Sequence, residues 1–217
     1  MIKKLLLGIT FFSSITFGAS LNTESQIKSL YNQLHIQNKL TYSTFHKAIK
    51  GYNKIPNKRE GKITIVDFSK PSNEERFFVI DLDRKKVDYS TYVAHGKNTG
   101  ALSAVKFSNV ANSFQSSLGF YLTSNSYEGN NGYSLRLNGL EPGINSNAMK
   151  RNIVVHGADY ATKEFIDKYG FLGRSLGCPA IPSDISKEVI DHIKDGTVLY
   201  INGNDSNYFE KSAYASL

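Results

Sequence analysis

From Lys62 to Asn202, apolar residues tend to alternate with polar ones, and this period of two constrains the fold more than any other feature of the chain. The segments are rich in β-branched and aromatic residues, and breaks rich in Gly, Asn and Ser separate them, as is typical of short strands. The expected strands are KITIVDF (62–68), RFFVIDLD (76–83), KKVDYSTYVAHG (85–96), LGFYLTSNSY (118–127), YSLRLNGL (133–140), NIVVHG (152–157) and TVLYIN (197–202). Short strands this close together predict a compact, mainly β and mainly antiparallel sandwich or barrel.

Helical periodicity is found on either side of these strands. In residues 23–56, apolar residues recur at spacings of three and four until Pro56 ends the pattern. One late helix is expected in PSDISKEVIDHIKDG (182–196), with Ser183 as a plausible N-cap and Gly196 at its end. We therefore predict an N-terminal helical segment over 21–60, one β domain over 61–203, and a surface tail over 204–217.

The first residues, 1–20, have the layout of a secretory signal peptide. Lys3 and Lys4 precede an apolar stretch from Leu5 to Phe17, and small residues follow it. The cleavage point stays open, because Phe17 is bulky where a cut after Ala19 favours a small residue. The apolar stretch is shorter than the roughly 20 residues that a membrane span needs, so no span is expected. The protein is predicted to be exported, to a periplasm or cell wall.

The formal net charge is +7, which is compatible with an anionic polymer such as a cell wall as partner. The basic residues are scattered, and no basic run is interleaved with aromatic residues. A nucleic-acid partner is therefore not expected.

Cysteine usage is more informative, because the chain has a single cysteine, Cys178. It cannot form an internal disulfide, and an unpaired cysteine in an exported protein indicates an intermolecular bridge or a reactive thiol. The alternative is a buried, inert cysteine. No cluster of His, Asp or Glu accompanies it at ligand spacing, so neither a metal nor a cofactor is predicted.

The residues around Cys178 contain the parts that a thiol nucleophile needs. His156 ends the apolar run NIVVHG and is the candidate base, and the carbonyl of Gly157 could hold its ring in one tautomer. In GRSLGCPAIP (173–182), Gly177 removes bulk where N–H groups would converge on an oxyanion. Arg174 adds a charge that could favour the thiolate or hold a substrate carboxylate. Each residue also has an ordinary structural interpretation.

Four stretches closely resemble the YkuD-type murein L,D-transpeptidase catalytic domain, and in particular its second branch, which carries an HGA…GRSxGCPA pattern. They are VAHGKNTG (93–100), FSNVANSFQSSLGFYLTSNSYEGNNGYSLRLNGLEPGINSNA (107–148), IVVHGADYA (153–161) and GRSLGCPAIP. The resemblance spans roughly residues 62–202. Sortases are the nearest competing family by the order His, Cys, Arg, but their arginine follows the cysteine, whereas Arg174 precedes it.

The resemblance implies roles for particular residues. Cys178 matches the nucleophile, His156 the base, Gly157 the carbonyl that orients the base, and the backbone from Leu176 through Gly177 to Cys178 the oxyanion hole. Leu176 stands where the commoner SHGCxR motif has a second histidine, and Ala180 where it has an arginine. Residues predicted to contact substrate are Arg174, Ser175, Leu176 and His95, although His95 could also simply end a strand.

The function that this resemblance implies is an exported cysteine L,D-transpeptidase. It would act on peptidoglycan tetrapeptide stems through a thioester, release D-alanine and form cross-links to a second stem or to a wall-linked protein. Three alternatives stay open: an L,D-carboxypeptidase with water as acceptor, a sortase-like protein ligase, and a wall-binding or structural protein with an inert Cys178. The acceptor, the cross-link type, the oligomeric state and the role of residues 21–60 are not determined by the sequence.

Overall fold

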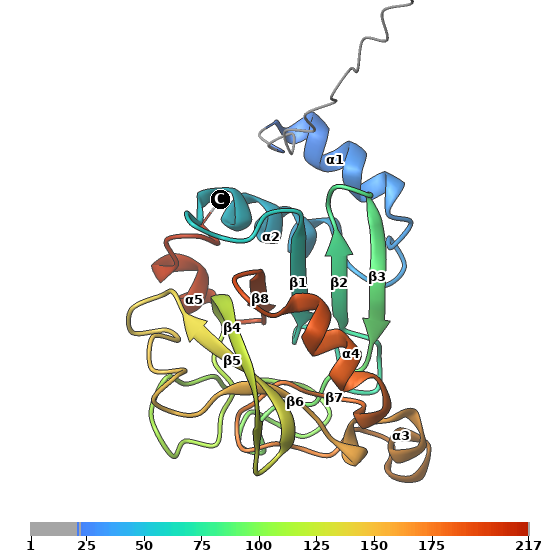
Figure 1. Ribbon diagram of the computed structural model, residues 1–217, viewed down its shortest axis with the longest axis vertical. Coiled ribbons are helices and arrows are strands. Elements are labelled where there is room, and N and C mark those ends of the chain that lie inside the picture. Colours follow the sequence, from blue (N-terminus) through green and yellow to red (C-terminus); the bar gives the residue numbers. More distant parts are fainter. Residues whose placement is uncertain (1–20, 22, 217) are drawn as a thin grey trace, which may run out of the picture.

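The computed structural model describes residues 21 and 23–216, so the predicted signal peptide lies outside the described residues. The mainly β fold class predicted from the sequence is confirmed, with a single sheet at the centre of the molecule (Figure 1). The strands are β1 (Lys62–Asp67), β2 (Phe77–Asp81), β3 (Lys86–Thr91), β4 (Gly119–Gly129), β5 (Gly132–Gly139), β6 (Val154–Gly157), β7 (Ala180–Ile181) and β8 (Val198–Asn202). The helices are α1 (Glu24–Gln33), α2 (Tyr42–Lys54), α3 (Lys163–Tyr169), α4 (Ser183–Ile193) and α5 (Ser206–Lys211), with a 3-10 turn, η1, at Asp159–Ala161.

The sheet has the order β3-β2-β1-β8-β4-β5-β6-β7 and is nearly closed on itself. Neighbouring strands are antiparallel except for the pairs β1–β8 and β6–β7, which are parallel. The chain that leaves edge strand β3 returns to the opposite edge, where Ala94 pairs with Ala180 and Gly96 with Ser175. The segment that contains Ala94 and Gly96 thus crosses from one edge of the sheet to the other. GRSLGCPAIP therefore pairs with this segment on one side and with β6 on the other.

The N-terminal helices pack into the same core as the strands. Thr41 accepts the N–H of Thr44 and caps α2, whose buried face contains Phe45 and Ile49. Gly51 allows the helix to lie directly on the sheet, since a Cβ at this position would be 2.1 Å from the ring of Phe120. No helix in residues 21 and 23–216 is long and apolar enough to cross a membrane.

Two short helices were not predicted, α3 and α5, and α5 lies in the region expected to be a surface tail. Asp205 caps α5, and Tyr208 is buried against the domain. Ser212 donates a hydrogen bond to the buried carboxylate of Glu141, which also accepts the N–H of Phe120. Because a buried carboxylate must be satisfied by donors, it anchors the C-terminal segment to the domain. Local sequence periodicity does not reveal Glu141 as the partner of this segment, because Glu141 is distant in the sequence.

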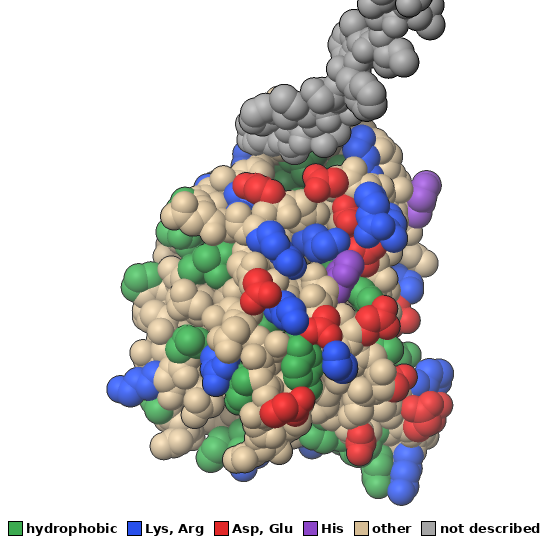
Figure 2. Space-filling model, in the orientation of Figure 1, with side chains coloured by type: hydrophobic (Ala, Val, Ile, Leu, Met, Phe, Trp, Pro, Cys, Tyr) green, Lys and Arg blue, Asp and Glu red, His purple; other side chains and the backbone are tan. Residues whose placement is uncertain are grey.

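Charged side chains of both signs are intermixed on the face that Figure 2 shows, over the region where Figure 1 places α1 and β1–β3. Asp88, for example, lies within salt-bridge distance of Lys62, Lys86 and His192. The net charge of +7 is therefore not gathered into a basic patch on this face.

The segment that contains Ala94 and Gly96 is held in place by a fully buried arginine, Arg76. Its guanidinium donates to the carbonyls of Val93 (2.8 and 3.0 Å) and Lys70 (2.8 Å) and to Nδ1 of His95 (2.8 Å). The other ring nitrogen of His95 donates to the Gly100 carbonyl at 3.1 Å. Burial, and secondarily the charge of Arg76, lower the pKa of His95 to about 4, so this ring is neutral at neutral pH.

Replacing Arg76 by Met is expected to lower the free energy of unfolding by about 3 kcal/mol or more, because two buried acceptors and one part-buried acceptor lose their donors. Urea denaturation measures this loss. The matched control is Arg84→Met, since the Arg84 side chain is 59% exposed beside Asp81 and its loss should lower the free energy of unfolding far less. Equal losses for the two variants would contradict the assignment of Arg76 as the anchor.

Candidate active site

Cys178 and His156 are brought together by the parallel pairing of β6 with β7. His156 on β6 is the register partner of Ala180 on β7, and Cys178 directly precedes this pairing along the chain. The thiol lies beside the same strand, because the N–H of Val154 points at its Sγ at 3.5 Å. The single cysteine and the histidine that ends NIVVHG therefore share one edge of the sheet.

The thiol of Cys178 is almost completely buried, with 8% of the residue exposed. It can donate its own proton to the carbonyl of Asn152, with an Sγ–O distance of 3.6 Å. Burial raises the pKa of the thiol, while the Val154 N–H and the positive charge of Arg151 oppose that rise. Cys178 thus rests as a protonated thiol near neutral pH and needs a base to become nucleophilic.

The imidazole of His156 is oriented by its own backbone. Its Nδ1–H donates to the Gly157 carbonyl at 2.8 Å, which leaves Nε2 as the proton-accepting nitrogen. No hydrogen-bond partner of Nε2 occurs within the described part of the chain. Burial lowers the pKa of His156, and the bond to Gly157 only partly opposes this effect, so the ring is neutral at neutral pH.

The turn before Cys178 is closed by Ser175. Its Oγ donates to the Cys178 carbonyl at 2.6 Å and accepts the Gly177 N–H at 3.1 Å. Gly177 has φ +128°, and a Cβ there would lie 2.9 Å from the Gln115 carbonyl oxygen, so the position requires glycine. The N–H of Gly177, predicted to serve the oxyanion hole, is occupied by Ser175. The N–H of Cys178 has no protein acceptor among residues 21 and 23–216.

Three predicted substrate-binding residues occupy different environments. His95 is 1% exposed with both ring nitrogens bonded, so the structure places it in the core and not in a cleft. Arg174 donates to the Gly100 carbonyl at 3.4 Å and lies over the ring of Phe171, and neither contact involves the thiol. Leu176 is 61% exposed and stands on the surface next to the turn.

Two residues near the thiol were not singled out from the sequence. Arg151, in the loop before β6, is the cation that acts on Cys178, and Tyr160, in η1, lies close enough for the thiol to affect it. Burial, and secondarily Cys178, raise the pKa of Tyr160 to about 12. Tyr160 belongs to the HGADY stretch that was already noted, whereas Arg151 stands in a loop without a periodic pattern.

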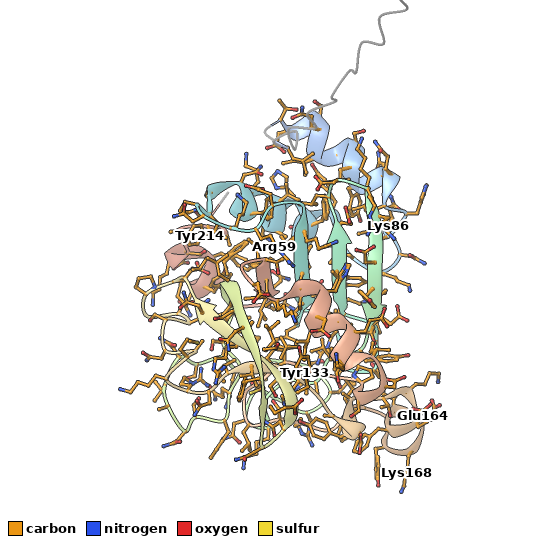
Figure 3. The ribbon with its side chains drawn as sticks, viewed as in Figure 1. Arg59, Lys86, Tyr133, Glu164, Lys168 and Tyr214 are labelled. Atoms are coloured by element: carbon orange, nitrogen blue, oxygen red, sulfur yellow. The ribbon has the colours of Figure 1, made fainter. Side chains whose placement is uncertain are left out.

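A separate surface hollow of about 610 Å³ lies between the end of β3, α3 and the start of α4. Its lining includes Asp159, Asp184 and Glu164, the last of which is labelled in Figure 3, but not Cys178 or His156. Over the described residues, no group of three or more His, Cys, Asp or Glu side chains is arranged to hold a metal ion.

Comparison with known proteins supports the resemblance noted in the sequence. The profile of a family described as the L,D-transpeptidase catalytic domain matches residues 36–202. Because this match covers most of the chain, the protein belongs to the L,D-transpeptidase catalytic domain family, a family of acyl-transferring enzymes. A search of curated proteins found no match.

Several solved structures are similar to this chain at low sequence identity. An L,D-transpeptidase from Mycobacterium smegmatis is 13% identical, with a TM-score of 0.41, over 66% of this chain and 59% of the other. An L,D-transpeptidase from Stackebrandtia nassauensis is 16% identical, with a TM-score of 0.41, over 84% of this chain and 78% of the other. The helical cell shape determining protein Pgp2 from Campylobacter jejuni is 11% identical, with a TM-score of 0.44, over 67% and 48%. The chain spans only 58% and 59% of the length of two of the mycobacterial-type L,D-transpeptidases it matches.

We expect NMR titration of His156 to give a pKa below the ordinary histidine value of about 6.5, because its ring is buried without a carboxylate partner. Because the folded-state pKa of His156 is lowered, the unfolded chain binds more protons than the folded chain once the pH falls toward and below about 6.5. His156 therefore destabilises the fold as the pH falls below about 6.5 and has no such effect above it. The His156→Gln variant identifies the resonance, and a pKa at or above 6.5 would show that the ring is not desolvated.

Proposed function

We propose that this chain is an exported cysteine L,D-transpeptidase that acts on peptidoglycan tetrapeptide stems, with Cys178 as nucleophile and His156 as general base. One observation carries the proposal: the single thiol lies beside the strand whose terminal histidine is fixed through Nδ1 to Gly157. The proton-accepting nitrogen of that ring is thereby left for the chemistry. Family membership supports the reaction class, and the predicted signal peptide supports export.

In the first half of the reaction, a thioester replaces a peptide bond. His156 Nε2 takes the proton of the Cys178 thiol as Sγ attacks the carbonyl carbon between the diamino acid and the terminal D-alanine. The N–H of Cys178 is the donor proposed for the developing oxyanion. The C–N bond then breaks, and the imidazolium returns its proton to the departing amine of D-alanine.

In the second half, a side-chain amine of another stem attacks the thioester carbonyl. His156, now neutral, removes the proton from the attacking amine and gives it to the sulfur as the C–S bond breaks. The products are a new amide cross-link and the regenerated thiol. With water in place of the amine, the same steps trim the tetrapeptide to a tripeptide, which is the carboxypeptidase alternative. A wall-linked protein amine would be a third acceptor.

The electrostatics of the pair suit this mechanism. A raised thiol pKa and a lowered imidazole pKa both favour the neutral pair over the thiolate–imidazolium pair in the resting protein. Separating charge in a buried site is unfavourable, so the proton moves only as Sγ bonds to the carbonyl carbon and the negative charge passes to the carbonyl oxygen. Charge then develops on the oxyanion, where a backbone donor is available.

Incubation of the purified protein with a disaccharide tetrapeptide, followed by mass analysis, tests the proposal. We expect cross-linked dimers and free D-alanine, no product with Cys178→Ala, and a loss of about 10²- to 10⁴-fold with His156→Gln. Tripeptide without dimers would support the carboxypeptidase. Full activity of Cys178→Ala, with its fold verified by circular dichroism, would show that Cys178 is not the nucleophile. The absence of any product with the wild type would support a wall-binding or structural function.

Carbapenems give a second, independent measurement. An L,D-transpeptidase structure similar to this chain was solved in complex with imipenem. We expect the wild-type mass to increase by one whole carbapenem, because the thiol opens the β-lactam ring without losing an atom of it. Cys178→Ala should stay unmodified under the same exposure. An unmodified wild-type protein after prolonged exposure would count against Cys178 as an acyl-accepting nucleophile.

A further inference from the structure

Arg151 makes an unusually complete set of contacts to one segment of the chain. Its Nη1 donates to the Ser108 carbonyl (2.6 Å) and to Ser117 Oγ (2.8 Å). Its Nη2 donates to the Gln115 carbonyl (2.6 Å) and to Ser113 Oγ (3.3 Å). All four acceptors belong to residues 108–117, here named loop 108–117. The guanidinium therefore fixes the course of this loop between β3 and β4.

The same guanidinium lies against the turn that carries the thiol. Its Nη2 is 3.4 Å from the position that a Cβ would take at Gly177. The next residue in the chain, Asn152, accepts the Cys178 thiol proton through its carbonyl. Arg151 is thus placed next to Cys178 by two routes, through space at Gly177 and along the chain at Asn152.

The positive charge of Arg151 has no acidic partner in the described part of the chain. No Asp or Glu oxygen there lies within 4.0 Å of its nitrogens, and its four hydrogen-bond acceptors are neutral carbonyls and hydroxyls. The side chain is only partly exposed. A partly desolvated cation without a counterion lowers the free energy of any anion formed beside it. The thiolate of Cys178 is such an anion.

We propose that Arg151 is a positioning residue for Cys178, which stabilises the thiolate by its fixed charge and holds loop 108–117 against the catalytic turn. The proposal rests on the proposed function only in taking Cys178 as the nucleophile. Four of the five guanidinium N–H donors are already used, so Arg151 cannot offer the two-pronged fork with which arginine binds a substrate carboxylate. Arg151 therefore acts through its charge and its bonds to loop 108–117, and not as a carboxylate-binding fork. Arg174, the cation expected from the sequence, contacts Gly100 and Phe171 instead.

Loop 108–117 needs such an anchor because its backbone is strained. Asn112 and Phe114 have φ +59° and +54°, a left-handed conformation that is unfavourable for a bulky residue such as Phe. The Phe114 carbonyl nevertheless accepts the Asn98 N–H at 3.1 Å, and it would be 2.5 Å from a Cβ at Gly96. The bonds from Arg151 hold the loop in this close contact with the segments that pair with the Cys178 turn.

The titration of Cys178 reports the charge of Arg151 directly. Among the other titratable groups, Tyr160 in η1 is affected by the thiol, and His156 lies on β6, whose Val154 N–H points at the sulfur. Both are neutral at neutral pH. Cys178 is the only cysteine, so alkylation by iodoacetamide labels a single site. We expect Arg151→Gln and Arg151→Met to raise the midpoint of the pH–alkylation profile by about one unit, because a nearby opposite charge lowers a pKa by about one to three units. Below the midpoint, this shift reduces the thiolate fraction about tenfold.

Three further variants separate charge from structure. Arg151→Lys keeps the charge but loses the four-bond pattern, so its midpoint should stay within about half a unit of the wild type while its melting temperature falls. Arg59→Gln, on the connection between α2 and β1 (labelled in Figure 3), removes the same charge from a side chain whose one hydrogen bond within the described residues is to the His192 carbonyl. It should leave the midpoint unchanged. Arg174→Gln tests the competing cation and should also leave the midpoint unchanged.

An unchanged midpoint in folded Arg151→Gln or Arg151→Met, with a lowered melting temperature, would reduce Arg151 to a structural role and overturn the proposal. A larger shift from Arg174→Gln than from either variant would overturn it too. If neither neutral variant folds, Arg151→Lys decides, and a midpoint raised by a full unit would refute the role of the charge. Since alkylation requires no peptidoglycan, this outcome is independent of whether the cross-linking assay succeeds.

Discussion

The buried guanidinium of Arg76 is the interaction on which the geometry of the site depends. It holds the carbonyl of Val93 and the ring of His95, and so fixes the segment that returns from β3 to the far edge of the sheet. That segment pairs with Ala180 and Ser175, on either side of Cys178. A charge buried at this depth is tolerated because each nitrogen of the guanidinium donates to an acceptor. Cys178, the proposed nucleophile, is thereby positioned from a distance, through backbone pairing.

The site combines two neutral groups with one fixed cation. Burial acts in opposite directions on the pKa of the thiol and the pKa of the imidazole, and in both cases it favours the uncharged form. Arg151 opposes part of this effect at the sulfur, while its N–H groups donate to loop 108–117. In the mechanism proposed above, His156 would have to take the proton from a thiol that holds it more tightly than a free cysteine does.

The sequence predicts those parts of the structure that local pattern determines. The strand at KITIVDF and the helix begun near Ser183 follow from periodicity, and the order of His156 and Cys178 follows from two short motifs. Arg151 could not be found this way, because its neighbours are brought to it by a loop that crosses the fold. His95 shows the converse: its motif resembles a site residue, but the partner that buries it, Arg76, stands on another strand connection. The helix α5 likewise depends on Glu141, whose side chain is distant in sequence.

The resting state of Cys178 also affects how long the protein lasts. Oxidants attack a thiolate far faster than a thiol, so a sulfur that stays protonated and almost covered is slow to form a sulfenic acid. The chain has no second cysteine that could capture such a species as a disulfide and return it to use. Once oxidised, the thiol would be lost without an external reductant. The burial that makes Cys178 slow to ionise is therefore also its protection against oxidative damage.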